Sequence, residues 1–591
     1  MSCESNAKNE PGSGTGMTAE SSAEHGSSAA HDVGDGHAPP RPFARLRHLL
    51  QPERRDLGAV LVFAGAVAVL SLATPIAVES LVNTVSFGIL LWPILVIAGV
   101  LTGILGLAAA IRAMQVYVVE CIQRRLFVRV VADYAHRLPR LQLEAFDRRY
   151  GPELTNRFFD ILNLQKSLAT LLLDGVAILV TAVVGMVVLA FYHPLLLAFD
   201  IILLLLIAFL LFVLGWGGVR TCLDESQAKY DVAAWLEELL RCLRGFKFAG
   251  GQHLALEKAD QLTGEYVTAR QRHFRVVWRQ TVFALGLQVV ASTALLALGG
   301  YLVINRQLTL GQLVAAELIV SLVVASLAKL GKYTATYYDL LSGAEKLGLL
   351  TDLPMEREGG EALAESGRGM ALRVHGVTRV SGRALPTQAD WHVAPNERVA
   401  LVGPPGSGVT TLFEVLCGLR EPGHGVVEVD GIDLRGLSLE YLRERAVLVE
   451  GSDVFLGTVL ENVRVGRPDL TPGEVREALQ VVGLLGVVHD LPHGLDTQLI
   501  PGGGPLSASQ GVRLTLARAL AGRPRLLILD GVLDGLDLGM SPDLSPRLFD
   551  RSAPWTLLIA STKPEVVGMC DRIIPLSATE LPERASPTER G

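Results

Sequence analysis

Residues 403–411 read GPPGSGVTT, a glycine-rich turn of the kind that surrounds phosphate groups. In such a turn, backbone N–H groups at the start of a helix face the phosphates, and a lysine adds a positive charge. Val409 stands at the position where this pattern has the lysine. The sequence therefore predicts a phosphate site that keeps its shape but lacks part of its chemistry. The residues predicted to surround the phosphates are Gly403, Gly406, Ser407, Gly408, Val409, Thr410 and Thr411.

Alternating strands and helices are expected around this turn, from about residue 366 to 578. Residues 397–403, ERVALVG, read as a buried strand, and residues 410–419 read as the helix that follows it. A second apolar strand, RLLILD, ends in Asp530. The Asp530 carboxylate and the Thr410 hydroxyl are the predicted ligands of Mg²⁺, because this ion prefers oxygen ligands. This segment therefore predicts an α/β domain that binds a nucleotide.

The first half of the chain has the composition of a membrane domain. The chain has 591 residues, 50% of them hydrophobic, and a mean hydropathy of +0.37, which is too apolar for a purely soluble protein. Runs of about 20 apolar residues are long enough to cross a bilayer. Six such runs lie at 57–82, 87–111, 167–191, 195–218, 280–304 and 309–330. They predict an all-α, six-helix transmembrane domain over residues 41–348.

The distribution of Lys and Arg predicts the orientation of these spans. Basic residues gather before the first span and in the long loops before the third and fifth spans, which places these loops and both termini in the cytoplasm. Apolar residues recur every three to four positions in both loops, which predicts helical arms that reach the soluble domain. Loops that only close the bundle are the alternative. Residues 1–40 and 579–591 are predicted to be tails, the first of them disordered.

Two acidic residues lie inside the expected spans, Asp200 in the fourth and Glu317 in the sixth. A carboxylate is costly to bury in lipid, so both are candidates for a transport pathway. A neutral carboxyl group or a helix contact is the alternative for each. The net charge of −7 is small for this length, and no basic patch with aromatic residues predicts a nucleic-acid partner.

These motifs together resemble a half-transporter of the ATP-binding-cassette (ABC) exporter family over residues 42–578. The further matching segments are VVEVDGIDL (426–434), GTVLENVRVGRPD (457–469), GLDTQLIPGGG (494–504) and LTLGQLV (308–314). The resemblance implies a multi-domain chain, in which a six-helix transmembrane domain precedes an α/β P-loop nucleotide-binding cassette. It also implies ATP and Mg²⁺ as cofactors, a lipid bilayer and a second half-transporter as partners, and a bacterial plasma membrane as the location.

The resemblance also shows where this chain departs from the family pattern. Gly531 follows Asp530 where the family has the glutamate that activates water, and Thr562 stands where the family has a switch histidine. A missing general base alone typically slows a reaction by about 10² to 10⁴. ATP hydrolysis at this chain's own site is therefore expected to be impaired. The other departures are Glu450 near the usual glutamine, Val380 or Ser381 near the adenine-stacking ring, and Lys563 as a weak candidate for a substitute cation.

The signature motif stays near the family pattern at Leu506, Ser507, Ala508, Ser509 and Gln510. Ala508 and Ser509 replace two glycines, while Ser507 and Gln510 are retained. A serine hydroxyl at a helix N-terminus suits the γ-phosphate of ATP bound to a partner, although an ordinary serine-capped helix is the alternative. We therefore expect the degenerate half of a heterodimeric exporter. The alternatives are a non-hydrolysing ABC-fold membrane protein with a scaffolding or regulatory role, and a weakly active homodimeric ABC ATPase.

Overall fold

The computed structural model describes residues 42–86, 91–147, 156–248, 250–363, 366–380, 383–536 and 544–576. The predicted tails at 1–40 and 579–591 lie outside these residues. The chain divides into two compact units. The first unit comprises residues 1–126 and 159–348, and the second comprises residues 127–158 and 349–591.

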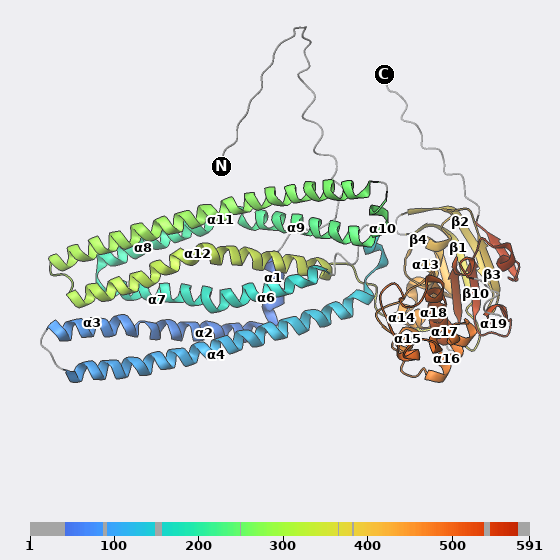
Figure 1. The fold of residues 1–591 in the computed structure, drawn as a ribbon, viewed down its shortest axis with the longest axis horizontal. Helices are drawn as coiled ribbons and strands as arrows, with labels where there is room; N and C mark the ends of the chain where they lie inside the picture. Colours follow the sequence, from blue (N-terminus) through green and yellow to red (C-terminus); the bar gives the residue numbers. More distant parts are fainter. Residues whose placement is uncertain are drawn as a thin grey trace, which may run out of the picture. The chain divides into compact units, whose positions relative to one another are not determined.

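The first unit consists of long helices that lie alongside one another (Figure 1). They are α1 (Pro42–Leu50), α2 (Arg54–Ser71), α3 (Ala73–Ser86), α4 (Leu91–Arg137), α6 (Asp160–Thr170), α7 (Val176–Tyr192), α8 (Pro194–Ala208), α9 (Gly218–Arg241), α10 (Leu243–Phe246), α11 (Gly251–Ile304) and α12 (Leu310–Thr351). A tight turn at His193 joins α7 to α8. There the His193 ring accepts a hydrogen bond from the Leu195 N–H at 3.1 Å, and Pro194 takes the first position of α8, where its missing N–H costs nothing.

Five helical segments of the described chain are long and apolar enough to cross a membrane. They are Pro42–Asn83, Ile94–Arg140, Arg157–Tyr192, Pro194–Arg241 and Gly251–Ile304. Apolar side chains such as Val96, Leu205 and Val289 are more than half exposed on them, as expected where lipid is the solvent. The sixth expected span lies on α12, where the apolar stretch of the described chain is Gly311–Ser321.

The first long loop forms the arm that its periodicity predicted. α4 continues past the apolar span to Arg137, and the turns Leu138–Arg140 and Leu143–Phe146 follow it. This segment belongs to the second unit, where the Gln142 N–H donates to the Pro354 carbonyl at 3.0 Å. Arg420 holds the Asp147 carboxylate with two hydrogen bonds of 2.8 and 2.6 Å. The alternative that this loop only closes the bundle is therefore wrong.

The second long loop also forms a helical arm. α9 continues well beyond the expected end of the fourth span, and the short helix α10 follows it. Gly250, with a φ of 74°, then lets the chain reverse into α11. The Trp235 indole donates to the Ala255 carbonyl at 3.2 Å and packs edge-to-face on Phe246, with ring centroids 5.5 Å apart. At the tip of this arm, the side chains of Leu240 and Phe248 are exposed.

The second unit contains the predicted α/β domain (Figure 1). A parallel sheet has the strand order β11-β3-β10-β9-β6, and an antiparallel sheet has the order β2-β1-β4-β5. The parallel strands are β3 (Arg398–Val402), β6 (Ala446–Val449), β9 (Leu526–Asp530), β10 (Thr556–Ala560) and β11 (Arg572–Pro575). The antiparallel strands are β1 (Leu372–Val380), β2 (Arg383–Val393), β4 (Pro422–Val429) and β5 (Ile432–Asp433), and a separate pair joins β7 (Gly457–Thr458) to β8 (Gln498–Leu499).

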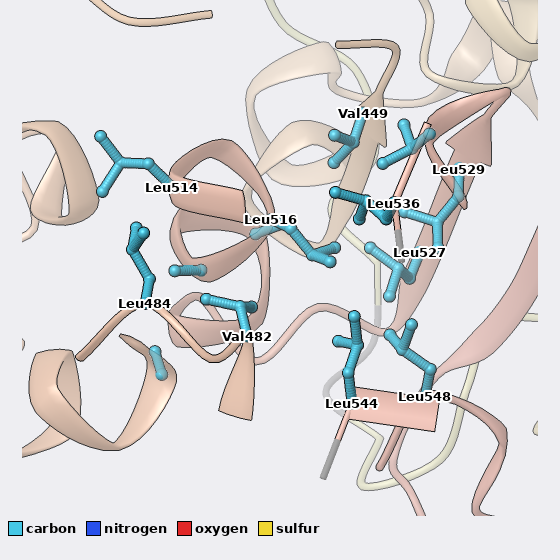
Figure 2. Close-up of a cluster of buried hydrophobic side chains, with 14 of the residues drawn as sticks. Val449, Val482, Leu484, Leu514, Leu516, Leu527, Leu529, Leu536, Leu544 and Leu548 are labelled. Carbon is cyan, nitrogen blue, oxygen red and sulfur yellow. The ribbon is translucent and has the colours of Figure 1, made fainter. Parts of the chain in front are cut away.

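Helices pack on the parallel sheet or on one another and bury its apolar strands. They are α13 (Val409–Leu416), α14 (Leu439–Arg445), α15 (Val459–Arg464), α16 (Pro472–Val481), α17 (Leu485–His489), α18 (Ala508–Ala521), α19 (Leu544–Phe549) and α20 (Pro564–Val567). Figure 2 shows one buried cluster, in which Leu516 of α18 lies with Leu527 and Leu529 of β9. These strands read as continuous apolar runs because a parallel sheet is buried on both faces. Their carboxyl ends meet at one edge, which places the loops after β3, β9 and β10 together.

Candidate nucleotide site and signature helix

The loops after β3, β9 and β10 surround an open cavity of about 840 Å³. All the predicted phosphate-loop residues from Gly403 to Thr411 line it, together with Asp530, Gly531 and Thr562. The structure therefore brings together residues that lie more than a hundred positions apart in the sequence. Leu401, Val402, Asp534, Ala560, Ser561, Pro564, Val567 and Ile573 complete the described lining.

The phosphate loop has the backbone that its glycines require. Gly406 and Gly408 have φ angles of 84° and 85°, in the left-handed region that other residues avoid. A Cβ atom at Gly403 would lie 2.5 Å from the Ser407 hydroxyl oxygen, so this position has no room for a side chain. α13 begins directly after Gly408, which turns its first N–H groups toward the cavity.

Val409 provides an apolar contact where the loop pattern has a cation. Its side chain is half-buried and packs against the core cluster that contains Leu412 and Phe413. The described residues that line the cavity include no lysine, arginine or histidine, while Asp530 and Asp534 are both acidic. The site therefore has the shape to hold a triphosphate without a side-chain cation to neutralise it.

The two predicted magnesium ligands lie side by side. The Thr410 hydroxyl and an Asp530 carboxylate oxygen are 2.5 Å apart. Both are the oxygen ligands that Mg²⁺ prefers, and Mg²⁺ usually keeps several waters and binds substrate phosphates rather than a full set of protein ligands. These residues therefore fit a magnesium ion that arrives with a nucleotide.

Gly531, at the position where the sequence led us to expect the general base, has no side chain. Its φ of 65° is left-handed, and its N–H donates to the Ala560 carbonyl at 3.0 Å. A Cβ atom built here would meet nothing within 4 Å, so space is open. The backbone conformation, however, would strain any other residue by about 1 to 2 kcal/mol. This strand end is therefore adapted to glycine, and a carboxylate is not easily placed here.

Thr562, at the switch-histidine position, is bound within the protein. Its N–H and its hydroxyl donate to one Asp534 carboxylate oxygen at 2.8 and 2.7 Å, and the Ser561 hydroxyl donates to the other. Burial alone would raise the pKa of Asp534, but these hydrogen bonds outweigh burial and hold the pKa below its usual value. Asp534 and Ser561 were missed in the sequence, although their place after neighbouring parallel strands is the signal that could have found them.

Lys563 does not replace the missing cation. Its ammonium group donates to the carbonyl oxygens of Leu533 and Leu536 at 3.3 and 3.2 Å. It is absent from the described lining of the cavity. The idea of a shifted substitute lysine is therefore wrong for this arrangement.

The two remaining departures add no positive charge. Glu450 follows β6, and burial raises the pKa of its carboxyl group, with further contributions from the negative charges of Glu414 and Asp530. Val380 is the last residue of β1 and is buried in the core, and Ser381 lies outside the described residues. Val380 therefore supplies no aromatic ring that could stack on adenine.

The signature motif forms the start of α18. Ser507 caps the helix, since its hydroxyl accepts from the Gln510 N–H at 3.3 Å while the Gln510 side chain accepts from the Ser507 N–H at 2.8 Å. Ser507, Ala508 and Ser509 are exposed, whereas Leu506 is buried. The serine-capped helix is thus present as a local structure, and its N-terminal residues are exposed.

Arg518 and Thr515 hold α18 against α15 and the loop after β6. The Arg518 guanidinium donates to the carbonyls of Asn462 and Asp453, both at 2.7 Å, and the Asp453 N–H donates to the Thr515 hydroxyl at 3.0 Å. A Cβ atom at Gly511 would lie 2.3 Å from the Ser452 hydroxyl oxygen, so this contact is close. The sequence gives no local signal for these contacts, because their partners are distant along the chain.

The two membrane carboxylates lie on different helices. Asp200 on α8 is 5% exposed, and neither of its carboxylate oxygens has a hydrogen-bond partner in the described chain. One buried carboxylate oxygen of Glu317 on α12 also has no hydrogen-bond partner in the described chain. Their role in a pathway stays a prediction.

Comparisons with known proteins agree with this architecture. The family model described as ABC transporter transmembrane region matches residues 57–327, and the model described as ABC transporter matches residues 387–533. A fatty acid ABC transporter ATP-binding/permease protein of Mycobacterium tuberculosis is 28% identical over 79% of this chain and 74% of its own length. An ATP-dependent lipid A-core flippase of Ralstonia nicotianae is 26% identical over 93% of this chain and 94% of its own.

A solved structure has the same fold. The structure of a bacterial Atm1-family ABC exporter with ATP bound superposes with a TM-score of 0.79, covering 89% of this chain and 94% of that one. The sequence identity is 20%, so this likeness concerns the fold alone.

Proposed function

Because the chain belongs to the ABC transporter family, as an exporter-type membrane region followed by a nucleotide-binding domain, we propose that it is the catalytically degenerate half of a heterodimeric exporter. In this proposal, an intact partner hydrolyses ATP against the signature motif of this chain. The site formed by this chain's own phosphate loop binds nucleotide weakly and hydrolyses it poorly.

The lining of the nucleotide cavity carries the proposal. Its described residues include neither a cation nor a carboxylate at the general-base position, because Val409 and Gly531 stand there. Removing one electrostatic contact to the reacting group typically costs about 10² to 10³ in rate, and losing a general base costs about 10² to 10⁴. The two losses do not add, but either alone makes hydrolysis at this site slow.

The exposed start of α18 supports the second half of the proposal. A helix N-terminus attracts negative charge, and the exposed Ser507 hydroxyl and nearby N–H groups are the contacts that a bound γ-phosphate needs. The exposed apolar tip of the second arm, at Leu240 and Phe248, is a further surface that a partner would cover.

We propose that the protein lies in a bacterial plasma membrane with both termini in the cytoplasm. Lys and Arg gather before the first span and in the two long loops, and loops rich in these residues usually lie on the cytoplasmic side. The relatives are named for fatty acids and for the lipid A core. A lipid or another amphiphile is therefore the cargo class that we favour.

Coexpression with an intact half-transporter tests the proposal. The partner chosen has lysine, glutamate and histidine at the positions that correspond to Val409, Gly531 and Thr562. We expect the purified pair to hydrolyse ATP, and we expect removal of the partner's glutamate to abolish this activity. Val409→Ala in this chain is the matched control and should leave the activity unchanged.

Two outcomes would contradict the proposal. ATPase activity that survives loss of the partner's glutamate would locate hydrolysis in this chain and favour a homodimeric ATPase. A pair that assembles but neither hydrolyses ATP nor transports would favour the scaffolding alternative.

A further inference from the structure

We propose that a charged cavity at the end of the membrane spans binds the acidic head group of an amphiphile, so that anionic amphiphiles are the substrate class of the proposed exporter. This inference rests on the proposed function. The sequence did not reveal the cavity, because its charged residues are spread over three helices that are distant along the chain.

The cavity lies between α6, α9 and α12 of the first unit and has a volume of about 580 Å³. Four lysines and three carboxylates line it. Asn163, Ser167, Thr170, Ser226 and Thr336 add hydrogen-bonding groups to its wall. This lining is polar enough to solvate an ionic group and too polar for a hydrocarbon tail.

Two of the carboxylates already have cationic partners. Lys346 forms an ion pair of 3.2 Å with Asp160, and both side chains are nearly fully buried. The Tyr230 hydroxyl also donates to Asp160 at 2.7 Å. Glu225 is held by Arg270. These ion pairs neutralise Asp160 and Glu225, so Asp339 is the remaining carboxylate of the described lining.

Three lysines remain that form no ion pair in the described chain, although Lys229 also interacts electrostatically with Asp339. Lys166 lies on α6, Lys229 on α9 and Lys332 on α12, and all three line the cavity. Lys229 lies over the ring of Tyr230 at 5.2 Å, and Lys332 lies over that of Tyr333 at 6.0 Å. Asp339 is the remaining carboxylate of the described lining and offsets one of these three positive charges, which leaves an excess of positive charge that favours an anion.

The position of the cavity favours an anion attached to a hydrocarbon tail. α6 overlaps the start of the third expected span, α9 begins where the fourth ends, and the lining residues of α12 follow the sixth. Trp216, directly before α9, and Trp278 on α11 are exposed, as tryptophans at the head-group layer of a bilayer are. An acidic head group at this level reaches the lysines while its tail stays in the membrane.

Binding of oleate to the full chain tests the inference. The chain is placed in nanodiscs of phosphatidylcholine, and radiolabelled oleate is titrated by scintillation proximity. Methyl oleate provides the same tail without charge, and acetate and inorganic phosphate provide soluble anions. Lys166→Gln combined with Lys332→Gln should weaken oleate binding about five- to tenfold, because each lost ion pair is partly exposed.

Two matched variants control for charge and folding. Lys247→Gln removes a lysine from the exposed second arm and should leave oleate affinity unchanged. Lys166→Arg combined with Lys332→Arg keeps the charge and should keep most of the affinity. If the glutamine double variant binds no oleate because it misfolds, its unfolding temperature will be shifted. The arginine double variant then decides whether a positive charge at these two positions supports oleate binding.

Three results would overturn the inference. Methyl oleate could bind as tightly as oleate, acetate or phosphate could displace oleate at equal concentration, or the glutamine double variant could bind oleate normally. The assay needs neither a partner nor ATP. Its failure would therefore leave the proposed heterodimer standing, whereas a pair that binds oleate but never hydrolyses ATP would refute the proposed function alone.

Discussion

The nucleotide cavity and the start of α18 belong to the same domain but differ in what their side chains can still do. In the cavity, Val409 packs into the core, Gly531 has no side chain, and Thr562 is bound to Asp534. At α18, both partners of the capping box are present and the helix N-terminus is exposed. A chain that uses its own ATP needs both sites, whereas a chain that serves a partner's ATP needs only the second.

The largest expected effect is that of Ser507→Arg in the coexpressed pair. The bulky side chain removes the cap and blocks the N–H groups that would face the γ-phosphate, so ATPase activity should fall about 10²- to 10³-fold. Steady-state phosphate release measures this. An unchanged rate would mean that the signature of this chain does not serve the partner's ATP.

Leu516→Ala tests how firmly α18 is held. Leu516 is fully buried against β9, so the truncation should destabilise the α/β domain by about 2 to 5 kcal/mol. Ile573→Ala in the cavity wall is the control, since Ile573 is half exposed and should cost no more than about 0.5 kcal/mol. Denaturant unfolding of the full chain measures both changes in the free energy of unfolding. Equal losses of stability for the two variants would mean that α18 is held no more firmly than the wall of the nucleotide cavity.

Val409→Lys should restore binding without restoring chemistry. A lysine on the phosphates forms a charge-assisted hydrogen bond, so ATP affinity should rise about tenfold or more. Hydrolysis should stay at background because Gly531 offers no base. Fluorescent-nucleotide titration and phosphate release separate the two, and Val409→Met controls for side-chain volume. Rapid hydrolysis by the lysine variant would show that the missing cation is the whole defect.

The smallest expected effect concerns Asp534. Its hydrogen bonds lower its pKa in the folded state, so its stabilising contribution is present above the unfolded value of about 3.9 and is lost as the pH falls through the folded value. Thr562→Val removes one hydroxyl donor and should destabilise the domain by about 1 kcal/mol at neutral pH. Acid unfolding followed by circular dichroism should then begin at a higher pH. An unshifted acid transition would mean that Asp534 does not depend on Thr562.

The sequence predicted the parts of the fold that depend on local pattern. Continuous apolar runs identified β3 and β9, and helical periodicity identified the arm that continues α4. The glycines of the phosphate-loop motif predicted the loop, and the structure gives Gly406 and Gly408 the left-handed angles that few other residues adopt. These features are encoded within a few neighbouring residues.

The parts that the sequence did not predict depend on contacts between distant segments. Asp534 meets Thr562, Lys563 turns to the Leu533 and Leu536 carbonyls, and Arg518 reaches Asn462 only after the sheet has formed. Lone charged or hydroxyl residues in loops give no periodic signal. The lysines of the membrane cavity were missed for the same reason.

Phosphate release by the purified chain alone, free of any partner, tests the central claim most directly. The control is Asp530→Asn, which removes the carboxylate beside Thr410 that would hold magnesium. We predict that the natural chain and the Asp530→Asn variant release phosphate at the same background rate. Rapid release by the natural chain that the Asp530→Asn variant abolishes would contradict the proposal that its own site hydrolyses ATP poorly.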